Sequence, residues 1–308
     1  MNNKQKVILV TGATGLQGGA VAREALKQGF QVRILVRDIN SSKAKTLIEK
    51  GAEAFEGNFD NPSSLERAMQ NADAVFSMTN PATPGTDSER QQGFALIQSA
   101  LNSGIQQFVH TSVARAGTHT DFPRWESNYW PKQYWTDKWE VEEAIRTAGF
   151  SSWTILKPAN MMDNFLNSEH RKIMFPHFQQ GELKTAMLPD TRLDLITADD
   201  VATFACAAFN NPEKFNEKNI ELASESLTMD EVAAVLSNVT GKRLTVYSLS
   251  PEEAVNQGIF PGVVRSHEWD NEVGYNIDID SLKTYNIKLT TFKEWAEKYK
   301  DEIKINRV

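Results

Sequence analysis

Short apolar runs alternate with amphipathic stretches through the first half of the chain, and this alternation restricts the fold more than any other feature of the sequence. The runs are continuously apolar, which is typical of strands in a parallel sheet that is buried on both faces. We expect such strands at residues 7–10, 32–36, 54–55, 74–78, 108–110 and 153–156. Amphipathic helices occupy the intervals, and strands joined in this way build a sheet with helices on both sides. The sequence therefore predicts an α/β fold with a doubly wound parallel sheet.

The alternation ends after Pro158, and a less regular pattern follows. It contains one further candidate strand, at 219–222, and a helix that begins after Thr228. A threonine at the N-cap and two acidic residues in the first turn both favour a helix start at this point. The expected division is a first domain over 1–157, completed by a strand near 219–223, and a smaller, mostly helical portion, interleaved with it, over 158–308.

The composition excludes several classes of protein. Of the 308 residues, 40% are apolar and 24% are charged, as in an ordinary folded domain. Forty acidic and 33 basic side chains leave a formal charge of −7, and no long basic run is present, so direct binding of nucleic acid is not expected. Cys206 is the only cysteine and cannot form an intrachain disulfide. Without an apolar run of about 18 residues or the apolar core of a signal peptide, the sequence predicts a cytoplasmic protein that does not enter a membrane.

A glycine-rich segment, Thr11–Gly19, lies between the first expected strand and the first helix. Glycine permits a tight turn at Gly12, close approach of a pyrophosphate at Gly15, and close packing of the helix on the sheet at Gly18. The helix N-terminus then faces the phosphates with backbone N–H groups, and its dipole favours their negative charge. The spacing, G-x-x-G-x-x-G, differs from the common G-x-G-x-x-G, and a strand–helix turn with surplus glycine is the alternative. Strand, turn and helix together predict a Rossmann-like dinucleotide site.

The end of the second expected strand indicates which dinucleotide binds. Sites for NAD usually carry an acidic residue there, which holds the ribose 2′-hydroxyl. This chain has Arg37 at that point, and a guanidinium pairs with the 2′-phosphate that a carboxylate would repel. Asp38 follows directly, and we expect its side chain to point away from the ribose. The expected cofactor is NADP(H) in preference to NAD(H), with an NAD site or an unliganded surface arginine as the alternative.

Segments throughout the chain resemble the NmrA-like branch of the atypical short-chain dehydrogenases/reductases. The segments that carry the resemblance are Thr11–Gly19, Val32–Arg37, Gly51–Glu53, Asn58–Asp60, Phe76–Asn80, Gly104–Ile105, Lys138–Glu143, Lys157–Asn160, Asn211–Phe215 and Thr228–Glu231. Their order and spacing are shared with that family over most of the chain. The resemblance implies a Rossmann-like fold whose smaller C-terminal portion lies on the substrate side.

The resemblance also implies a role for each matching residue. The glycine-rich turn would wrap the pyrophosphate, and Arg37 would meet the 2′-phosphate. Asn58, where the family often has aspartate, would flank the adenine with Phe59, and Lys138 would reach the nicotinamide ribose. The cofactor-binding residues implied in this way are Gly12, Ala13, Thr14, Gly15, Leu16, Gln17, Gly18, Arg37, Asn58, Phe59, Thr79, Asn80, Pro81, Lys138, Asn160, Met161, Met162 and Asp163.

Tyr134 and Lys138 have the Tyr-x-x-x-Lys spacing of the short-chain dehydrogenases, and Ser112 follows the fifth expected strand. Residues four apart share one face of a helix, where a lysine cation would lower the pKa of the phenol. Tyr134 would then exchange a proton with the oxygen of a carbonyl or alcohol, and Ser112 would hydrogen-bond to the same oxygen. NmrA-like proteins often lack this tyrosine and keep the lysine, so a role for Lys138 in cofactor binding alone is the alternative.

Aromatic residues cluster in and beside the stretch 114–133, where four of the seven tryptophans fall within fifteen residues. The cluster comprises Phe122, Trp125, Tyr129, Trp130, Tyr134, Trp135 and Trp139. It is either a lid over a planar substrate such as a quinone, or a set of rings that packs the loop or forms a subunit contact, and we expect packing for most of them. The five histidines and Cys206 lack the spacing of metal ligands, so no metal site is expected.

Two functions are compatible with these residues. The first is an oxidoreductase that reduces a quinone or a small carbonyl compound by hydride transfer from NADPH, with Tyr134 as proton donor to a carbonyl. The second is a non-catalytic regulator that senses NADP(H) and acts through protein partners, as parts of the resembled family do. The presence of both Tyr134 and Lys138 favours the enzyme. The expected partners are a small-molecule substrate and either a second copy of the chain, as a homodimer, or a regulatory protein.

Overall fold

In the computed structural model, which describes residues 5–80, 82–83, 85–166 and 168–306, the chain forms two compact units. Unit 1 comprises Met1–His119, Pro131–Pro158 and Ala198–Glu221, and unit 2 comprises Thr120–Trp130, Ala159–Thr197 and Leu222–Val308. The chain therefore passes between the units several times. Each unit is built from segments that are distant in the sequence.

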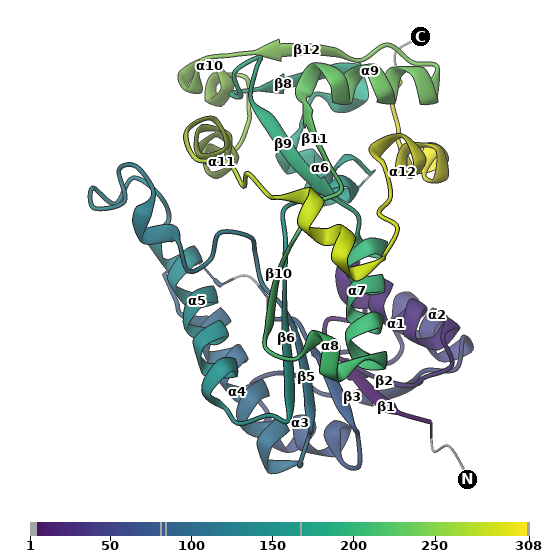
Figure 1. Cartoon of the computed structure of the whole chain (residues 1–308). Coiled ribbons are helices and arrows are strands. Elements are labelled where there is room, and N and C mark those ends of the chain that lie inside the picture. Colours follow the sequence, from purple (N-terminus) through teal and green to yellow (C-terminus); the bar gives the residue numbers. More distant parts are fainter. Residues whose placement is uncertain (1–4, 81, 84, 167, 307–308) are drawn as a thin grey trace. The chain divides into compact units, whose positions relative to one another are not determined.

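The sheet of unit 1 has seven strands in the order β10-β6-β5-β4-β1-β2-β3 (Figure 1). They are β1 (Val7–Val10), β2 (Gln31–Val36), β3 (Glu53–Glu56), β4 (Ala74–Ser77), β5 (Gln107–Thr111), β6 (Ser152–Pro158) and β10 (Lys218–Leu222). Parallel pairs join β1 to β2 and β4, β2 to β3, β4 to β5, and β5 to β6. The chain proceeds outward from β1 in one direction and then, from β4, in the other. This is the doubly wound order, and the expected fold class is confirmed.

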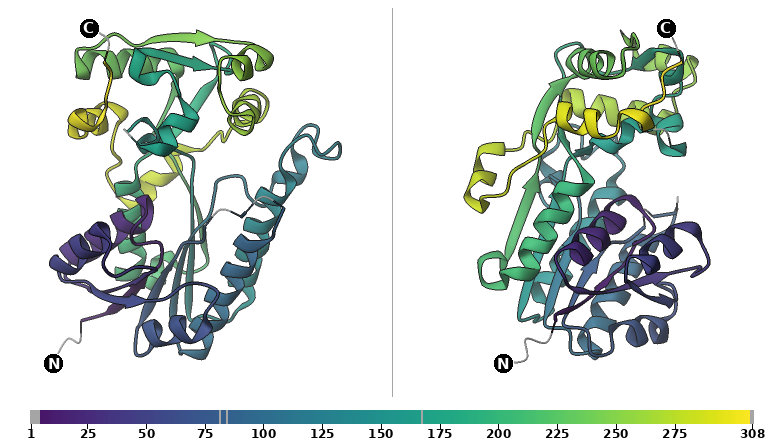
Figure 2. Two further views of the ribbon diagram at one scale, coloured as in Figure 1. Left: turned by 180° about the vertical axis from the view of Figure 1, so that it is seen from behind. Right: turned by 90° about the vertical axis from the view of Figure 1, so that its right-hand side faces the viewer.

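Helices cover both faces of this sheet. They are α1 (Leu16–Lys27), α2 (Ser42–Glu49), α3 (Pro62–Met69), α4 (Ser88–Asn102), α5 (Lys132–Thr147), α7 (Ala198–Asn210) and α8 (Pro212–Phe215). Figures 1 and 2 show α1 and α7 on one side of the sheet and α4 and α5 on the other. The buried residues of α1 and α7 include several alanines, which lets these two helices pack closely. On the other side, Leu96 and Ile145 of the helices pack with Leu9, Phe108 and Ile155 of the strands.

Unit 2 contains two small sheets and several helices. One sheet has the order β11-β9-β7, and a parallel pair of β12 and β8 forms the other. The strands are β7 (Asn160–Met161), β8 (Glu182–Thr185), β9 (Arg192–Ile196), β11 (Glu225–Thr228) and β12 (Thr245–Ser248). The helices are α6 (Glu169–Met174), α9 (Met229–Thr240), α10 (Pro251–Asn256), α11 (Pro261–Glu272) and α12 (Phe292–Lys298), with 3₁₀ turns η2 (Met162–Phe165), η3 (Phe178–Gln180), η4 (Ile279–Tyr285) and η5 (Lys300–Glu302). Phe165, Phe178 and Trp295 are fully buried in the core of this unit.

The sequence pattern after Pro158 predicts unit 2 only in part. α9 begins after Thr228 as expected, and Thr228 and Glu231 form a capping box there. The two small sheets were not expected, because the regular alternation of apolar runs and amphipathic stretches ends after Pro158, and no such pattern marks these strands. Within the described ranges, neither unit has a helix with the length and hydropathy needed to cross a bilayer.

Candidate functional site

The glycine-rich segment forms the turn between β1 and α1, at the carboxyl edge of the unit 1 sheet. Gly12 has a φ of +63°, a conformation that favours glycine. A Cβ atom on Gly18 would lie 2.4 Å from the carbonyl oxygen of Gly12 and 2.6 Å from that of Thr11. Because both neighbours are backbone atoms, only glycine at position 18 lets α1 begin directly against the end of β1.

The start of α1 has no side-chain cap. Its N-cap residue is Gly15, which is exposed and offers no acceptor to the backbone N–H groups of the first turn. Such N–H groups carry partial positive charge and bind anions. Beside them Ala13 is buried, Thr14 is half-buried and Leu16 is exposed. The turn therefore fits the pyrophosphate of a dinucleotide, since it presents donors where a side chain would otherwise fill the space.

Hydrogen bonds tie this turn to the neighbouring strands. The Thr11 hydroxyl donates to the carbonyl oxygen of Met78 at 3.0 Å and accepts from the Met78 N–H at 2.8 Å. The Thr111 hydroxyl donates to Oε1 of Gln17 at 2.7 Å. The carboxyl ends of β1, β4 and β5 are therefore held together beside the start of α1, which is where open α/β sheets bind ligands.

Arg37 and Asp38 follow β2, and both are exposed. In the part of the chain that the structure describes, no hydrogen bond or ion pair engages the Arg37 guanidinium. The Asp38 carboxylate, in contrast, accepts a hydrogen bond from the N–H of Asn40 at 2.8 Å and is turned into its own loop. The guanidinium is therefore available to an external anion, while the neighbouring carboxylate is occupied.

The residues expected to line the adenine and the middle of the cofactor follow β3 and β4. Oδ1 of Asn58 accepts a hydrogen bond from the N–H of Asp60 at 2.9 Å, and Phe59 packs, half-buried, against the core of unit 1. Asn80 is exposed after β4, and Pro81 lies outside the described residues. Because β3 and β4 run parallel to β1, these residues share the carboxyl edge of the sheet with the glycine-rich turn.

Lys138, on α5, is held by an ion pair that sequence reasoning missed. Its Nζ lies 2.5 Å from Oε1 of Glu89 on α4, and the hydroxyl of Thr79 donates to the same oxygen at 3.1 Å. Glu89 is almost fully buried. Burial acts to lower the pKa of Lys138, but the neighbouring Tyr134 and the Glu89 carboxylate outweigh that effect and raise it. Lys138 is therefore a cation at neutral pH, and the two helices set its position.

Tyr134 precedes Lys138 by one turn of α5. The Lys138 ammonium lies 5.0 Å from the centroid of the tyrosine ring, over its face. Although 38% of Tyr134 is exposed, withdrawal from water raises the pKa of its hydroxyl, Lys138 opposes this increase, and Glu89 adds to it. Lys138 acts to lower this pKa, as expected, but withdrawal from water and Glu89 together outweigh the lysine, so the net direction is upward. At neutral pH the phenol keeps its proton.

Ser112 takes part in a buried network of charged residues. Its hydroxyl donates to Oε1 of Glu142 at 2.6 Å. Glu142 is fully buried and also pairs with Arg146 at 2.7 Å and with Lys157 at 3.3 Å. The oxygen of Ser112 can still accept a hydrogen bond, but its proton is committed to Glu142 as long as this network is intact.

His110, on β5, is a further buried polar residue near Lys138. Its Nδ1 lies 3.1 Å from the hydroxyl of Ser77. Burial, and in second place the Lys138 cation, lower the pKa of His110 to about 3. The imidazole is therefore neutral at physiological pH and cannot act there as an imidazolium acid.

The last predicted cofactor residues belong to unit 2. Asn160 and Met161 form β7, and Met162 and Asp163 begin η2. Met162 is fully buried in the core of unit 2, so only its backbone is available to a ligand. Asp163 is also buried, whereas Asn160 and Met161 are half-buried and line a cavity within unit 2. The contacts of these four residues with a cofactor remain a prediction.

The aromatic cluster contributes its segment Thr120–Trp130 to unit 2, where the segment packs on α11. The rings of Phe122 and Trp269 meet edge to face with centroids 5.5 Å apart. The hydroxyl of Tyr129 donates to Oε1 of Glu268 at 2.6 Å. The two tryptophans of the segment are buried. Packing therefore accounts for these rings, in agreement with the expectation for most of the cluster.

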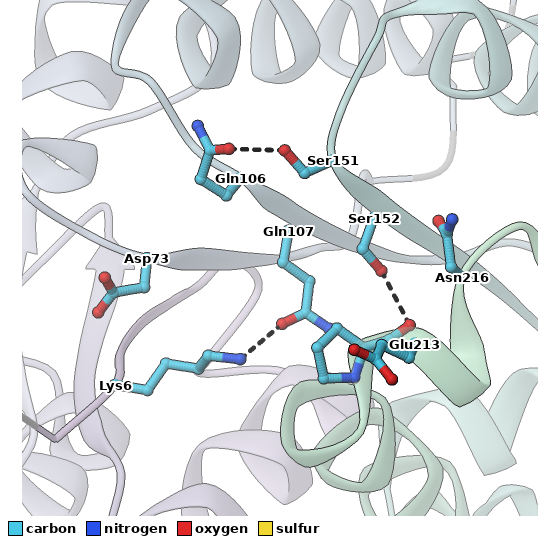
Figure 3. Close-up of a pocket in the computed structure, with 9 residues that line it drawn as sticks. Lys6, Asp73, Gln106, Gln107, Ser151, Ser152, Glu213 and Asn216 are labelled. Atoms are coloured by element: carbon cyan, nitrogen blue, oxygen red, sulfur yellow. Dashed lines mark hydrogen bonds between the residues drawn. The ribbon is translucent and has the colours of Figure 1, made fainter. Parts of the chain in front are cut away.

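The pocket drawn in Figure 3 lies at the opposite edge of the unit 1 sheet. It has a volume of about 460 Å³, and its lining includes Lys6, which precedes β1, and the first residues of β5 and β6, Gln107 and Ser152. Nζ of Lys6 donates to Oε1 of Gln107 at 2.8 Å (Figure 3). Because parallel strands have their amino ends at this edge, the pocket lies away from the glycine-rich turn and is not part of the expected dinucleotide site.

The groups assembled at the carboxyl edge suit an anionic ligand better than a metal ion. Among the described residues, no group of three or more His, Cys, Asp or Glu side chains is arranged to hold a metal. Burial raises the pKa of the Cys206 thiol to about 12, so this cysteine stays neutral. The edge instead offers peptide N–H groups, the Arg37 guanidinium, the Lys138 ammonium and the Tyr134 phenol.

The sequence matches the model of the NmrA-like family over residues 4–296. An NmrA-like family domain-containing protein of Dictyostelium discoideum is 28% identical over 302 residues, which cover 95% of this chain and 97% of that protein. An NmrA-like family domain-containing oxidoreductase of a Cladobotryum species is 29% identical over 259 residues, which cover 77% of this chain and 74% of that protein.

Solved structures share the fold over nearly the whole chain. The triphenylmethane reductase of a Citrobacter species, complexed with NADP(H), is 25% identical with a TM-score of 0.73, covering 95% of this chain and 99% of that one. NmrA, a negative transcriptional regulator in complex with NADP, is 22% identical with a TM-score of 0.73, covering 96% of this chain and 95% of that one. At the latter identity the likeness shows the fold alone.

Proposed function

Because this chain belongs to the NmrA-like family, we propose that it is an oxidoreductase that uses NADP(H), in preference to NAD(H), to reduce a quinone or a small carbonyl compound. The observation that carries the proposal is the turn between β1 and α1, where Gly18 brings an uncapped helix N-terminus against the sheet. An oxidoreductase among the relatives and a reductase bound to NADP(H) among the similar structures support it.

The residues at the carboxyl edge of unit 1 fit this cofactor. In the proposal, the backbone from Gly12 to Gly18 holds the pyrophosphate, and Arg37 pairs with the 2′-phosphate in a charge-assisted contact. Lys138 donates to the nicotinamide ribose while Glu89 fixes the position of its ammonium. When bound, NADPH supplies the hydride.

Tyr134 is the proposed proton donor when the substrate is a carbonyl compound. Its raised pKa keeps the phenol protonated at neutral pH, so a proton is present to be given. As the carbonyl carbon is reduced, its oxygen takes the phenol proton, and solvent replaces that proton afterwards. Because the proton of Ser112 is bound by Glu142, Ser112 makes no hydrogen bond to the carbonyl oxygen and can accept one only from the hydroxyl group of the alcohol product. A quinone can take its proton from solvent and needs no such donor.

A non-catalytic sensor of NADP(H) is the second candidate, and the arrangement of Lys138 favours it. The lysine is paired with Glu89 and lies over the face of the Tyr134 ring, so its ammonium is held in place for cofactor binding without any catalytic part for Tyr134. A sensor would bind NADP(H) through the same residues. It would then change its contacts with a second copy of the chain or with a regulatory protein instead of reducing a substrate.

Oxidation of NADPH by the purified chain, across a panel of quinones, ketones and aldehydes, tests the proposal. We expect turnover with at least one acceptor. Tyr134→Phe should slow carbonyl reduction by about 100-fold or more, the usual size of a lost proton donor, with NADPH affinity unchanged within about twofold. Tyr247→Phe, at another exposed tyrosine, is the matched control.

Two outcomes would contradict parts of the proposal. Tight NADPH binding without turnover of any acceptor would favour the sensor over the enzyme. Full carbonyl reduction by Tyr134→Phe would remove the tyrosine from the mechanism while leaving the oxidoreductase itself intact.

A further inference from the structure

The ion pair between Lys138 and Glu89 is withdrawn from water. Nζ of Lys138 lies 2.5 Å from Oε1 of Glu89, and only 14% of the lysine side chain and 3% of the glutamate side chain are exposed. The hydroxyl of Thr79 donates to the same oxygen at 3.1 Å, which holds the carboxylate in place. Because an ammonium has three N–H donors, the contact with Glu89 leaves others for a ligand. Charges that are shielded from solvent in this way act strongly on the groups beside them.

The two charges of this pair act in opposite directions on their neighbours. Lys138 lowers the pKa of Tyr134, whereas Glu89 raises it. The Lys138 cation also lowers the pKa of His110, in second place after burial, so its charge extends to β5. A group that lies beside Tyr134 and Lys138 is therefore subject to a cation and a carboxylate together, and removal of either one leaves the other uncompensated.

The charge of a nicotinamide ring depends on its oxidation state. The oxidised ring of NADP⁺ carries one positive charge, whereas the reduced ring of NADPH is neutral. An unpaired ammonium beside the ring would repel the oxidised form and have little effect on the reduced form. The carboxylate of Glu89 lies within hydrogen-bond distance of the Lys138 ammonium and opposes this repulsion.

We propose that Glu89 determines the preference of this site between oxidised and reduced nicotinamide: by neutralising Lys138, it allows the cationic ring of NADP⁺ to bind beside the lysine. The inference rests on the proposed function, which places the nicotinamide ribose at Lys138. Glu89 acts through Lys138 and is a positioning residue that itself needs no contact with the cofactor. For the reaction, the consequence is that the product NADP⁺ competes with NADPH for the site.

The test compares the dissociation constants of NADP⁺ and NADPH, measured by titration calorimetry on the intact chain and on Glu89→Gln. Glutamine keeps the size of the side chain and an acceptor for Thr79 but carries no charge. Titration at about pH 6.5 keeps Lys138 protonated in the variant, because burial favours loss of that proton while Glu142 still opposes it. We expect the ratio of the NADP⁺ constant to the NADPH constant to rise by about 10-fold, since the Lys138 cation is then unpaired.

Lys138→Met removes the other charge of the pair and keeps the proposal testable if Glu89→Gln does not fold. It leaves the carboxylate uncompensated, so the same ratio should fall, even though both forms of the cofactor bind more weakly. Glu140→Gln is the matched control. Glu140 also joins α5 to α4, through an ion pair with Arg90 at 2.8 Å, but 45% of its side chain is exposed. This variant should leave the ratio unchanged within about twofold.

Opposite changes of the ratio in Glu89→Gln and Lys138→Met would support the proposal, because a purely structural role of the ion pair would weaken both forms of the cofactor equally. Equal losses for NADP⁺ and NADPH in Glu89→Gln, or no loss for either, would overturn it. The unmodified chain reports separately on the proposed function. If it binds neither form, that function is contradicted and this inference with it, whereas binding of both forms with a ratio that Glu89→Gln does not change contradicts this inference alone.

Discussion

Arg37 and Asp38 are neighbours in the chain, but their side chains have different surroundings. The guanidinium has no partner among the described residues, whereas the carboxylate is bound to the backbone of its own loop. A 2′-phosphate would gain a charge-assisted contact with Arg37 without displacing any existing ion pair. This is why cofactor preference depends on a single side chain in our proposal.

Arg37→Ala should therefore weaken NADPH binding by about 10- to 100-fold, as expected for the loss of hydrogen bonds to a charged group. Binding of NADH, which has no 2′-phosphate, should change by no more than about twofold. Equilibrium titration of both cofactors measures the two effects. Arg67→Ala, at an exposed arginine of α3, is the control, and equal losses for NADPH and NADH in Arg37→Ala would contradict the assignment.

Other important residues could not be predicted from the sequence. Glu89 and Glu142 belong to amphipathic helices, where a glutamate usually faces solvent. Only the packing of α4 and α5 against the sheet shows that both are buried and paired with lysines. Because the burial of Glu142 cannot be seen in the sequence, Ser112 was predicted to hydrogen-bond to a substrate. In the structure its proton is bound by Glu142.

Among the elements, α1 depends most directly on one residue type. Its first turn contacts the backbone of the preceding loop at Gly18, so the helix can begin at the strand only without a side chain there. The requirement for glycine at position 18 arises from the way β1, the turn and α1 pack against one another. It links the stability of unit 1 to the position of the backbone N–H groups that are proposed to bind the pyrophosphate.

Gly18→Ala should reduce the free energy of unfolding by about 1–3 kcal/mol, because the added methyl group must displace backbone atoms. Urea unfolding measures this loss, and NADPH affinity should fall with it. Gly15→Ala is a milder substitution with which the Gly18→Ala variant is compared. A Cβ at position 15 would lie 3.1 Å from the carbonyl oxygen of Gly12, against 2.4 Å for a Cβ at position 18. An unfolding free energy of Gly18→Ala equal to that of the unmodified chain would show that the turn tolerates a side chain.

Strands that are buried on both faces were predicted from the sequence, whereas the strands of unit 2 were not. The central strands of unit 1 were predicted because a strand covered on both faces is a continuous apolar run, such as Val7–Val10. In unit 2, β7 has only two residues, and two of the four residues of β12 are exposed, so no continuous apolar run marks these strands. The cavity of unit 2 could not be predicted either, since its lining comes from β7, β9 and α11, which are distant in the sequence.

For the whole molecule, the family and the fold class were predictable, and both are confirmed. The expected strands, the glycine-rich turn and the later segments follow one another in an order that extends over the whole chain. That order identifies the family even though no single segment does so. The preference for NADP(H), the acceptor and the role of Tyr134 remain proposals. They depend on a few side chains and on a ligand, and neither the fold nor the family determines these.

Titration calorimetry of the intact chain with NADPH and, separately, with NADH tests the central claim most directly. The account predicts one binding site, with NADPH bound at least about tenfold more tightly than NADH, because only NADPH engages Arg37 through a 2′-phosphate. Equal affinities, tighter binding of NADH, or no binding of either cofactor would contradict it.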